Sequence, residues 1–416
     1  MSKIVIEGKK LLSGTISISG AKNSAVALIP AAILSDEEVT IMNVPEISDT
    51  EAMEEILTYL GAIVKGKSGT IKINSTNIKP KEIPEEISKK LRASYYFMSA
   101  LLAKYKHVCM YFPGGCSIGA RPIDQTLKGY KALGATVIEE GNKYTVFADK
   151  LIGGDVYLDM PSVGATINTM LVAVKAEGIT IINNAAKEPE IVNLATFLNN
   201  MGAKIKGAGT SEIRIEGVKK LYKATIEVIP DRIETGTYMI IGALIGNNLK
   251  IENIISDHVE SLILKLKEAG VDIKVNDDYC VINKVDYLKS IKIKTLGFPG
   301  FPTDLQQPLS TLLTQCNGVS TIEETLYENR FKHLEQLELM GAKYKIDGRK
   351  VYITGKTNLK GTIVTSTDLR GGASLVVAGL IADGTTIVED AEHILRGYSN
   401  IIDKLQNVGA KIKIED

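Results

Sequence analysis

Apolar and polar positions repeat along the chain at intervals of about 70 residues. In each repeat, a helix-like spacing of apolar residues ends at the motif apolar-x-x-apolar-Gly-(Ala/Val)-x-apolar, and an alternating segment follows. This pattern predicts a helix that ends on a glycine with a left-handed backbone, followed by a strand. The glycines of the motif are Gly61, Gly134, Gly202, Gly270, Gly341 and Gly409.

Every repeat also contains a stretch that is apolar on nearly all sides, which predicts a second, buried helix. A polar or glycine turn and a β-branched strand follow each stretch. One repeat therefore reads strand, helix, strand, helix, strand, strand (βαβαββ), with the sheets outside the buried helices. The predicted buried helices span Asn23–Leu34, Ala93–Ala103, Ala165–Ala176, Thr235–Ile245, Leu305–Thr314 and Gly372–Ala382.

The repeats fall into two groups of three, which predicts two domains of an α/β fold. A first strand pair (residues 3–20) precedes the first complete repeat, whereas the last repeat ends without a following pair. We therefore expect an N-terminal domain at residues 22–229 and a discontinuous C-terminal domain at residues 1–21 and 230–416. A ligand site is expected in the cleft between the domains.

Composition narrows the class of protein. Of 416 residues, 49 are Lys or Arg and 49 are Asp or Glu, which disfavours a broadly basic nucleic-acid-binding protein but allows a local basic cleft. No run approaches the ~20 apolar residues that span a bilayer, and the first residues do not resemble a signal peptide. The four cysteines and four histidines show neither disulfide nor zinc spacing. We expect a cytoplasmic protein without a metal, a nucleic-acid partner or a membrane-inserted segment.

Short motifs in order across all repeats resemble those of the enolpyruvyl transferases, and within them the branch that acts on UDP-N-acetylglucosamine. The resemblance covers the whole chain. The motifs are Gly20-Ala-Lys22-Asn23-Ser24, Pro113-Gly-Gly-Cys116-Ser-Ile-Gly-Ala-Arg121-Pro-Ile-Asp124-Gln125, Pro161-Ser-Val-Gly-Ala-Thr166, Pro230-Asp-Arg-Ile-Glu-Thr-Gly236, Phe301-Pro-Thr-Asp304, Glu328-Asn-Arg330-Phe331, Asp368-Leu-Arg370-Gly-Gly372 and Arg396-Gly-Tyr398.

The resemblance implies a reaction and a fold. The enolpyruvyl group of phosphoenolpyruvate moves to the 3′-hydroxyl of UDP-N-acetylglucosamine by addition and elimination, and phosphate leaves. This is the first committed step of peptidoglycan biosynthesis, and hence serves cell wall biogenesis, cell shape and cell division. The implied fold is EPSP synthase-like, with two inside-out α/β barrel domains of three-fold pseudosymmetry. No cofactor is implied, and we expect a monomer whose partners are its small-molecule substrates.

Cys116 has two interpretations. An average cysteine is a small core thiol, but Cys116 stands in a glycine-rich loop with Arg121 nearby, and a guanidinium charge lowers a thiol pKa. The resemblance makes Cys116 the general acid that protonates the methylene carbon of phosphoenolpyruvate. It also implies a covalent pyruvate adduct there and attack by the epoxide fosfomycin. The other cysteines, Cys109, Cys280 and Cys316, fit the core interpretation.

Cationic residues are expected to hold the anionic substrates. Lys22 and Asn23 open an apolar helix, whose free N–H groups favour anions, although an exposed lysine is the simpler alternative. By resemblance, Lys22 and Asn23 bind phosphoenolpyruvate, which Arg121 and Arg396 face with support from Arg370. The resemblance assigns contact with the UDP-sugar to Arg92, Arg121, Pro122, Ile123, Asp124 and Gln125, and a domain-closing contact to Arg330.

Asp304 also has two interpretations: an N-cap of the following helix, or, by resemblance, the general base that takes the sugar hydroxyl proton. We expect burial in a closed cleft to raise its pKa. Further expected contacts are Ser162, Val163 and Gly164 with the UDP diphosphate and, by resemblance, Leu326 with the sugar or uracil. Ser48 and Met160 stand where some relatives carry lysine, which leaves the affinity for UDP open.

Two alternatives remain. One is a sister enolpyruvyl transferase acting on shikimate 3-phosphate, which the Cys116 loop and the Ser162–Gly164 segment disfavour. The other is a catalytically idle paralogue that binds the UDP-sugar and regulates wall synthesis. The presence of all the expected catalytic residues, namely Cys116, Asp304, Lys22 and Arg396, argues against it.

Overall fold

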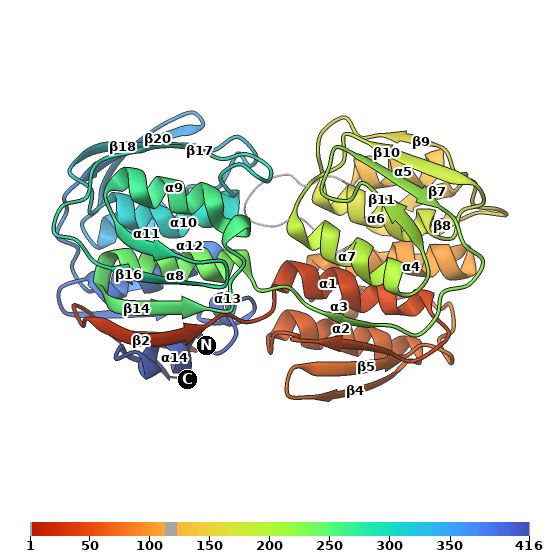
Figure 1. Cartoon of the computed structure of the whole chain (residues 1–416), viewed down its shortest axis with the longest axis horizontal. Coiled ribbons are helices and arrows are strands. Elements are labelled where there is room, and N and C mark those ends of the chain that lie inside the picture. Colours follow the sequence, from red (N-terminus) through yellow and green to blue (C-terminus); the bar gives the residue numbers. More distant parts are fainter. Residues whose placement is uncertain (1, 113–122, 416) are drawn as a thin grey trace. The chain divides into compact units, whose positions relative to one another are not determined.

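The structure is a computed structural model that describes residues 2–112 and 123–415. The described chain forms two compact units (Figure 1). The N-terminal unit runs from Gly20 to Ile229, and the C-terminal unit contains the chain up to Ser19 and from Pro230 onward. Each unit has its own buried apolar core.

The N-terminal unit places helices inside and sheets outside (Figure 1). Its helices are α1 (Lys22–Ala31), η1 (Ala32–Leu34), α2 (Ser48–Leu60), α3 (Glu85–Ser88), η2 (Arg92–Tyr95), α4 (Tyr96–Tyr105), α5 (Asp124–Ala132), α6 (Val163–Ala173) and α7 (Pro189–Asn200). Its strands are β3 (Val39–Met42), β4 (Ile63–Lys67), β5 (Thr70–Asn74), β6 (His107–Tyr111), β7 (Thr136–Glu140), β8 (Lys143–Phe147), β9 (Asp155–Tyr157), β10 (Ile179–Asn183), β11 (Lys204–Lys206), β12 (Glu212–Glu216) and β13 (Thr225–Glu227). They form the sheets β13-β3-β5-β4, β6-β8-β7 and β11-β12-β10-β9.

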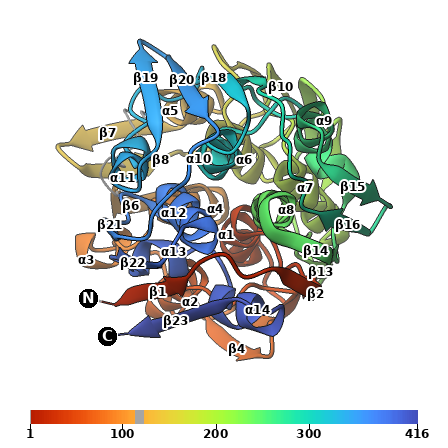
Figure 2. The ribbon, with the colours of Figure 1, turned by 90° about the vertical axis from the view of Figure 1, so that its left-hand side faces the viewer.

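The C-terminal unit repeats this plan, with α8, α10 and α12 enclosed by sheets (Figure 2). Its helices are α8 (Arg232–Ile245), η3 (Ser256–Val259), α9 (Glu260–Ala269), α10 (Thr303–Leu313), α11 (His333–Leu339), α12 (Leu369–Ile381), α13 (Glu392–Leu395) and α14 (Ile401–Asn407). Its strands are β1 (Lys3–Glu7), β2 (Leu12–Ser17), β14 (Gly246–Glu252), β15 (Asp272–Val275), β16 (Tyr279–Asn283), β17 (Lys292–Lys294), β18 (Gly318–Glu323), β19 (Lys343–Asp347), β20 (Lys350–Gly355), β21 (Ile363–Thr365), β22 (Thr385–Glu389) and β23 (Lys411–Glu415). They form the sheets β15-β16-β14-β2, β17-β18-β20-β19 and β21-β22-β1-β23.

The predicted repeat is confirmed by its glycines. All six have a left-handed backbone, with φ between 87° at Gly134 and 105° at Gly61, where a side chain would be strained. The six buried helices are also confirmed, although most begin one to three residues earlier than predicted. Polar residues such as Asp231 and Asp368 cap the helices ahead of the apolar run.

Strand exchange links distant parts of the sequence. β1 lies between β22 and β23 and is antiparallel to both. β2 is parallel to β14, whereas β13 is parallel to β3. Each segment that leads to a boundary between the units therefore completes a sheet of the unit it is leaving.

The second repeat departs from the predicted βαβαββ pattern. Among the described residues, its sheet has three strands, β6-β8-β7, and an isolated parallel bridge between Ile83 and Met110 stands where the fourth strand would lie. Pro80 and Pro84 flank Ile83, and proline lacks the N–H that a strand ladder needs. These prolines explain why the strand is reduced to one bridge.

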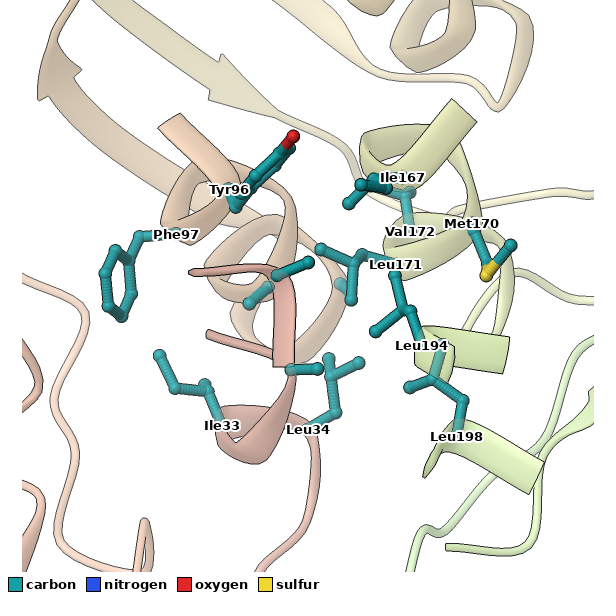
Figure 3. Packing of buried hydrophobic residues seen from close by; sticks show 14 of the residues in the cluster. Ile33, Leu34, Tyr96, Phe97, Ile167, Met170, Leu171, Val172, Leu194 and Leu198 are labelled. Atoms are coloured by element: carbon teal, nitrogen blue, oxygen red, sulfur yellow. The ribbon is translucent and has the colours of Figure 1, made fainter. Parts of the chain in front are cut away.

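Buried apolar helices form the centre of each unit. In the N-terminal unit, Leu34, Leu171 and Leu194 from η1, α6 and α7 lie close together (Figure 3) and are at most 2% exposed. No helix in the described ranges is long and apolar enough to cross a membrane. The described residues also contain no group of three or more His, Cys, Asp or Glu that could hold a metal ion.

Candidate active site

In the C-terminal unit, expected site residues converge on the first turn of α10. Arg330 Nη2 donates to Asp304 Oδ1 at 2.7 Å, and Arg370 Nε donates to Asp304 Oδ2 at 3.1 Å. Both arginines are 3% exposed, so water screens their charges poorly. Asp304 is thus held between two buried guanidinium groups.

Both local expectations for Asp304 need correction. The N-cap of α10 is Pro302 and no side chain caps the helix, so Asp304 is not a capping residue. Burial raises the pKa of Asp304, but the charges of Arg330 and Arg370 outweigh it and hold this pKa well below its ordinary value. The expected rise was wrong because the local sequence does not show that two arginines from other segments reach this carboxylate.

Arg330 is fixed within its own unit. Its Nη1 donates to Thr303 Oγ1 at 2.9 Å, and its carbonyl oxygen accepts from Gln306 Nε2 at 3.1 Å. The domain-closing contact expected for Arg330 stays a prediction. Leu326 lies in the same loop between β18 and α11, and its backbone N–H donates to Glu324 Oε1 at 2.8 Å.

Further hydrogen-bonded polar residues connect α10, α11 and α12 next to Asp304, Arg330 and Arg370. Asp368 caps α12 by accepting from the backbone N–H of Arg370 at 2.9 Å, and it accepts from Gln307 Nε2 at 3.1 Å. His333 Nε2 lies 2.8 Å from Ser310 Oγ. Burial holds the pKa of His333 below its ordinary value, so the ring is neutral near pH 7. These contacts fix the start of α12 against α10.

Arg396 lies near the start of α12. It is the C-cap of α13, and a Cβ on the adjacent Gly397 would lie 2.6 Å from Leu369 Cδ2. This close approach shows that the turn packs against the first residue of α12. Arg396 and Arg370 therefore come from neighbouring segments.

In the N-terminal unit, Lys22 and Asn23 are the first residues of α1. Lys22 Nζ lies 2.6 Å from Asp49 Oδ2, and their side chains are 12% and 3% exposed. Lys22 is therefore not the exposed lysine of the simpler alternative. The first turn of α1 contains no acidic residue, so no residue of that turn offsets the positive end of the helix dipole.

Arg92 and the Ser162–Gly164 segment are joined through Tyr95. Arg92 lies over the ring of Phe112, 5.1 Å from its centroid, and Tyr95 ends the same 3-10 helix. A Cβ on Gly164 would lie 1.8 Å from the Tyr95 hydroxyl oxygen, so only glycine allows this approach. Ser162 caps α6 by accepting from the backbone N–H of Ala165 at 3.3 Å.

The start of α5 is tied to the segment that leads into α6. Gln125 Nε2 donates to Asp159 Oδ2 at 2.9 Å, and Asp159 N–H donates back to Gln125 Oε1 at 2.8 Å. Hydrogen bonds from Lys128 and Gln125 lower the pKa of Asp159. Asp124 is exposed at the first position of α5, whereas Ile123 is buried before it.

Other expected residues are not described within these clusters. Cys116, Arg121 and Pro122 lie outside the described residues. Cys280 in β16 and Cys316 are buried, whereas Cys109 in β6 is half-buried, so the core interpretation is wrong for Cys109. Burial raises the pKa of both Cys280 and Cys316 to about 12. These two thiols are therefore protonated, as expected of core cysteines. Ser48 is the first residue of α2. Met160 is exposed and precedes α6.

Sequence reasoning missed the carboxylates that contact the expected residues, namely Asp49, Asp159 and Glu324. Only Glu324 had a usable signal. The alternation of β18 turns Ser320 and Ile322 inward, and its continuation turns Glu324 inward too, where it is 0% exposed. An acidic residue on the buried face of a strand needs a partner and marks a site worth testing.

Comparisons with known proteins agree with this architecture. The sequence profile described as EPSP synthase (3-phosphoshikimate 1-carboxyvinyltransferase) matches residues 6–405. A curated relative from Listeria monocytogenes, named UDP-N-acetylglucosamine 1-carboxyvinyltransferase 2, is 52% identical over 99% of this chain and 97% of its own. A relative of the same name from Bacillus cereus is 51% identical over 99% and 96%.

Solved structures give the same result. The enolpyruvyl transferase NikO from Streptomyces tendae matches with a TM-score of 0.91 and 25% identity, over 100% of this chain and 99% of its own. EPSP synthase from Acinetobacter baumannii matches the fold with a TM-score of 0.77, at 18% identity over the whole of both chains. The chain therefore belongs to the EPSP synthase family of enolpyruvyl transferases. Within that family, its curated relatives are UDP-N-acetylglucosamine 1-carboxyvinyltransferases.

Proposed function

We propose that this chain transfers the enolpyruvyl group of phosphoenolpyruvate to the 3′-hydroxyl of UDP-N-acetylglucosamine and releases phosphate. The observation that carries the proposal is the 52% identity, over nearly the full length of both chains, to a relative named for this activity. The reaction is the first committed step of peptidoglycan biosynthesis. We also propose that the chain acts as a monomer in the cytoplasm, with domains at residues 22–229 and at residues 1–21 and 230–416.

The chain offers suitable groups for each step. Protonation of C3 of phosphoenolpyruvate, by Cys116, gives C2 cationic character. The sugar 3′-oxygen then forms a bond to C2 and gives up its proton to Asp304. Transfer of a C3 proton back to the Cys116 thiolate and cleavage of the bond between C2 and the phosphate oxygen yield the enol ether and phosphate. Holding both reactants in place removes up to ~7–11 kcal/mol of entropic barrier in favourable cases.

The cationic residues are proposed to hold the anions. Lys22, Asn23, Arg396 and Arg121 face phosphoenolpyruvate, and Arg370 supports them. The UDP-sugar is assigned to Arg92, Arg121, Pro122, Ile123, Asp124, Gln125, Ser162, Val163, Gly164, Asp304, Leu326 and Arg330. Because α1 and α6 begin without acidic residues in their first turns, their N-termini suit anionic groups.

Arg330 and Arg370 form a clamp around Asp304, and this clamp limits when Asp304 can act as a base. Arg330 and Arg370 keep the carboxylate ionised, which a base requires, but they also weaken its attraction for a proton. A substrate anion beside Arg370 offsets the guanidinium charge and raises the proton affinity of Asp304. Under this proposal, Asp304 becomes an effective base only after phosphoenolpyruvate has bound.

The test is phosphate release with purified protein. Phosphoenolpyruvate with UDP-N-acetylglucosamine should release phosphate, whereas phosphoenolpyruvate alone or with shikimate 3-phosphate should not. Cys116→Ala should abolish most turnover and adduct formation, and Cys109→Ala should leave both unchanged. Release with shikimate 3-phosphate would favour the sister activity, and no release with either acceptor would favour a binding paralogue.

A further inference from the structure

Glu324 is a fully buried acidic residue that the proposed chemistry does not use. It follows β18 and is 0% exposed. A buried carboxylate is costly unless hydrogen bonds satisfy both oxygens. Within the described part of the chain, four donors surround Glu324, and they come from three different segments of the C-terminal unit.

One oxygen of Glu324 shapes the loop that carries Leu326. Glu324 Oε1 accepts from the backbone N–H of Leu326 at 2.8 Å and of Tyr327 at 3.3 Å. It also accepts from Thr295 Oγ1 at 2.9 Å, and Thr295 in turn accepts from the backbone N–H of Thr325 at 2.9 Å. This oxygen therefore fixes the turn at Leu326.

The other oxygen reaches the first turn of α10. Glu324 Oε2 accepts from Thr303 Oγ1 at 2.7 Å. Because the Thr303 hydroxyl gives its only proton to Glu324, a lone pair of its oxygen faces Arg330 Nη1, which donates to it at 2.9 Å. Arg330 Nη2 then donates to Asp304 Oδ1 at 2.7 Å. Arg330 therefore donates to both Asp304 and Thr303, and Thr303 donates onward to Glu324.

We propose that Glu324 is a positioning residue for the acceptor sugar. Glu324 joins the turn at Leu326 to the hydrogen-bonded residues Thr303, Arg330 and Asp304. It therefore fixes the position of Leu326, the sugar contact, relative to Asp304, the proton acceptor. The inference rests on the proposed function, because it takes Leu326 and Asp304 as groups that meet the UDP-sugar.

The chemistry requires a carboxylate at this position. All four neighbours donate hydrogen bonds to Glu324, and an amide accepts through one oxygen only. In Glu324→Gln, the backbone N–H groups of Leu326 and Tyr327 still donate to the amide oxygen, so the amide NH2 group faces Thr303. The Thr303 hydroxyl must then turn its proton towards Arg330, which disturbs the pairing with Asp304.

The test is steady-state kinetics on the full chain. Glu324→Gln should raise the KM for UDP-N-acetylglucosamine and lower kcat, each by about tenfold, since hydrogen bonds to charged groups are among the strong ones. The KM for phosphoenolpyruvate should stay within about twofold. Glu323→Gln is the matched control, because it makes the same substitution one residue earlier, where the side chain pairs with Lys294 and Lys350 at the surface.

A double-mutant cycle separates positioning from simple loss of stability. Thr303→Val should reproduce the kinetic defect, Thr303→Ser should restore activity, and Glu324→Gln with Thr303→Val should cost little more than either change alone. If circular dichroism shows that Glu324→Gln does not fold, the comparison of Thr303→Val with Thr303→Ser tests the proposal instead.

Two outcomes would overturn the inference: wild-type kinetics in both Glu324→Gln and Thr303→Val, or additive defects in the double variant. Failure of the proposed function looks different, because the unaltered chain itself would then release no phosphate with UDP-N-acetylglucosamine.

Discussion

The central helices of the two units begin in opposite ways. In the C-terminal unit, Asp231 caps α8, Asp304 lies in the first turn of α10 and Asp368 caps α12. In the N-terminal unit, α1 and α4 begin without a side-chain cap, and α6 begins with Ser162. No acidic residue stands in the first turn of these three helices.

This difference teaches how one repeat serves two kinds of chemistry. Carboxylates at a helix N-terminus offset the positive end of its dipole, so the C-terminal unit places an acidic group beside arginines at this position. The N-terminal unit leaves the dipole uncompensated and adds Lys22 at α1 and Arg92 before α4. The first arrangement suits proton transfer, and the second suits anion binding.

The largest expected effect comes from removing the charge at α10. Asp304→Asn should lower kcat by about 10²- to 10⁴-fold, the usual contribution of a general base. Binding of UDP-N-acetylglucosamine, measured by isothermal titration calorimetry, should remain within a few-fold. Asp347→Asn, at an exposed position, serves as the control. A variant that turns over normally but binds UDP-N-acetylglucosamine poorly would show that Asp304 is not the general base.

The next effect tests the anion-binding side. Lys22→Met should weaken phosphoenolpyruvate binding and cut kcat/KM by about 100-fold, since hydrogen-bonded charge contacts contribute about 1.5–3 kcal/mol. It should also destabilise the protein, because buried Asp49 loses this cation. Adding Asp49→Asn should restore the urea midpoint but not the activity. Recovery of both would mean that Lys22 serves only as the partner of Asp49.

A smaller effect tests the close approach between Tyr95 and Gly164. Gly164→Ala places a methyl group 1.8 Å from the Tyr95 hydroxyl oxygen, and relief of such overpacking costs about 1–3 kcal/mol. The KM for UDP-N-acetylglucosamine should rise because η2 and Arg92 shift. In a Tyr95→Phe background the loss of stability should be partly recovered. Equal losses in both backgrounds would show that the hydroxyl is not the obstacle.

The smallest effect is the pH dependence that the Asp304 clamp gives the C-terminal unit. The pKa of Asp304 is lower in the folded state than its ordinary value of 3.8, so its contribution to stability is complete above that value and declines as the pH falls further. The stability gap between the wild type and Asp304→Asn should narrow by on the order of 1 kcal/mol between pH 5 and pH 3. Urea unfolding at several pH values measures it, and a constant gap would contradict the clamp.

The repeat and the buried helices could be predicted because they depend on local patterns. The helix-ending glycines and the apolar stretches are written into short segments, and the structure confirms both. The second repeat differs where Pro80 and Pro84 interrupt a strand, a signal that was present but not used. The ion pairs could not be predicted, because Asp304, Arg330 and Arg370 come from three segments whose approach depends on how α10 and α12 pack.

The exchanged strands also set an order of assembly. β1 is an inner strand of its sheet, and Lys3 pairs with Glu415, so nearly the first and nearly the last residues of the chain meet. During synthesis, β1 and β2 therefore stay unpaired until the N-terminal unit has been made, because their partner strands follow it in the sequence. The sheet that contains β1 is complete only after β23 has been made, so the C-terminal unit finishes folding after the N-terminal unit has been synthesised.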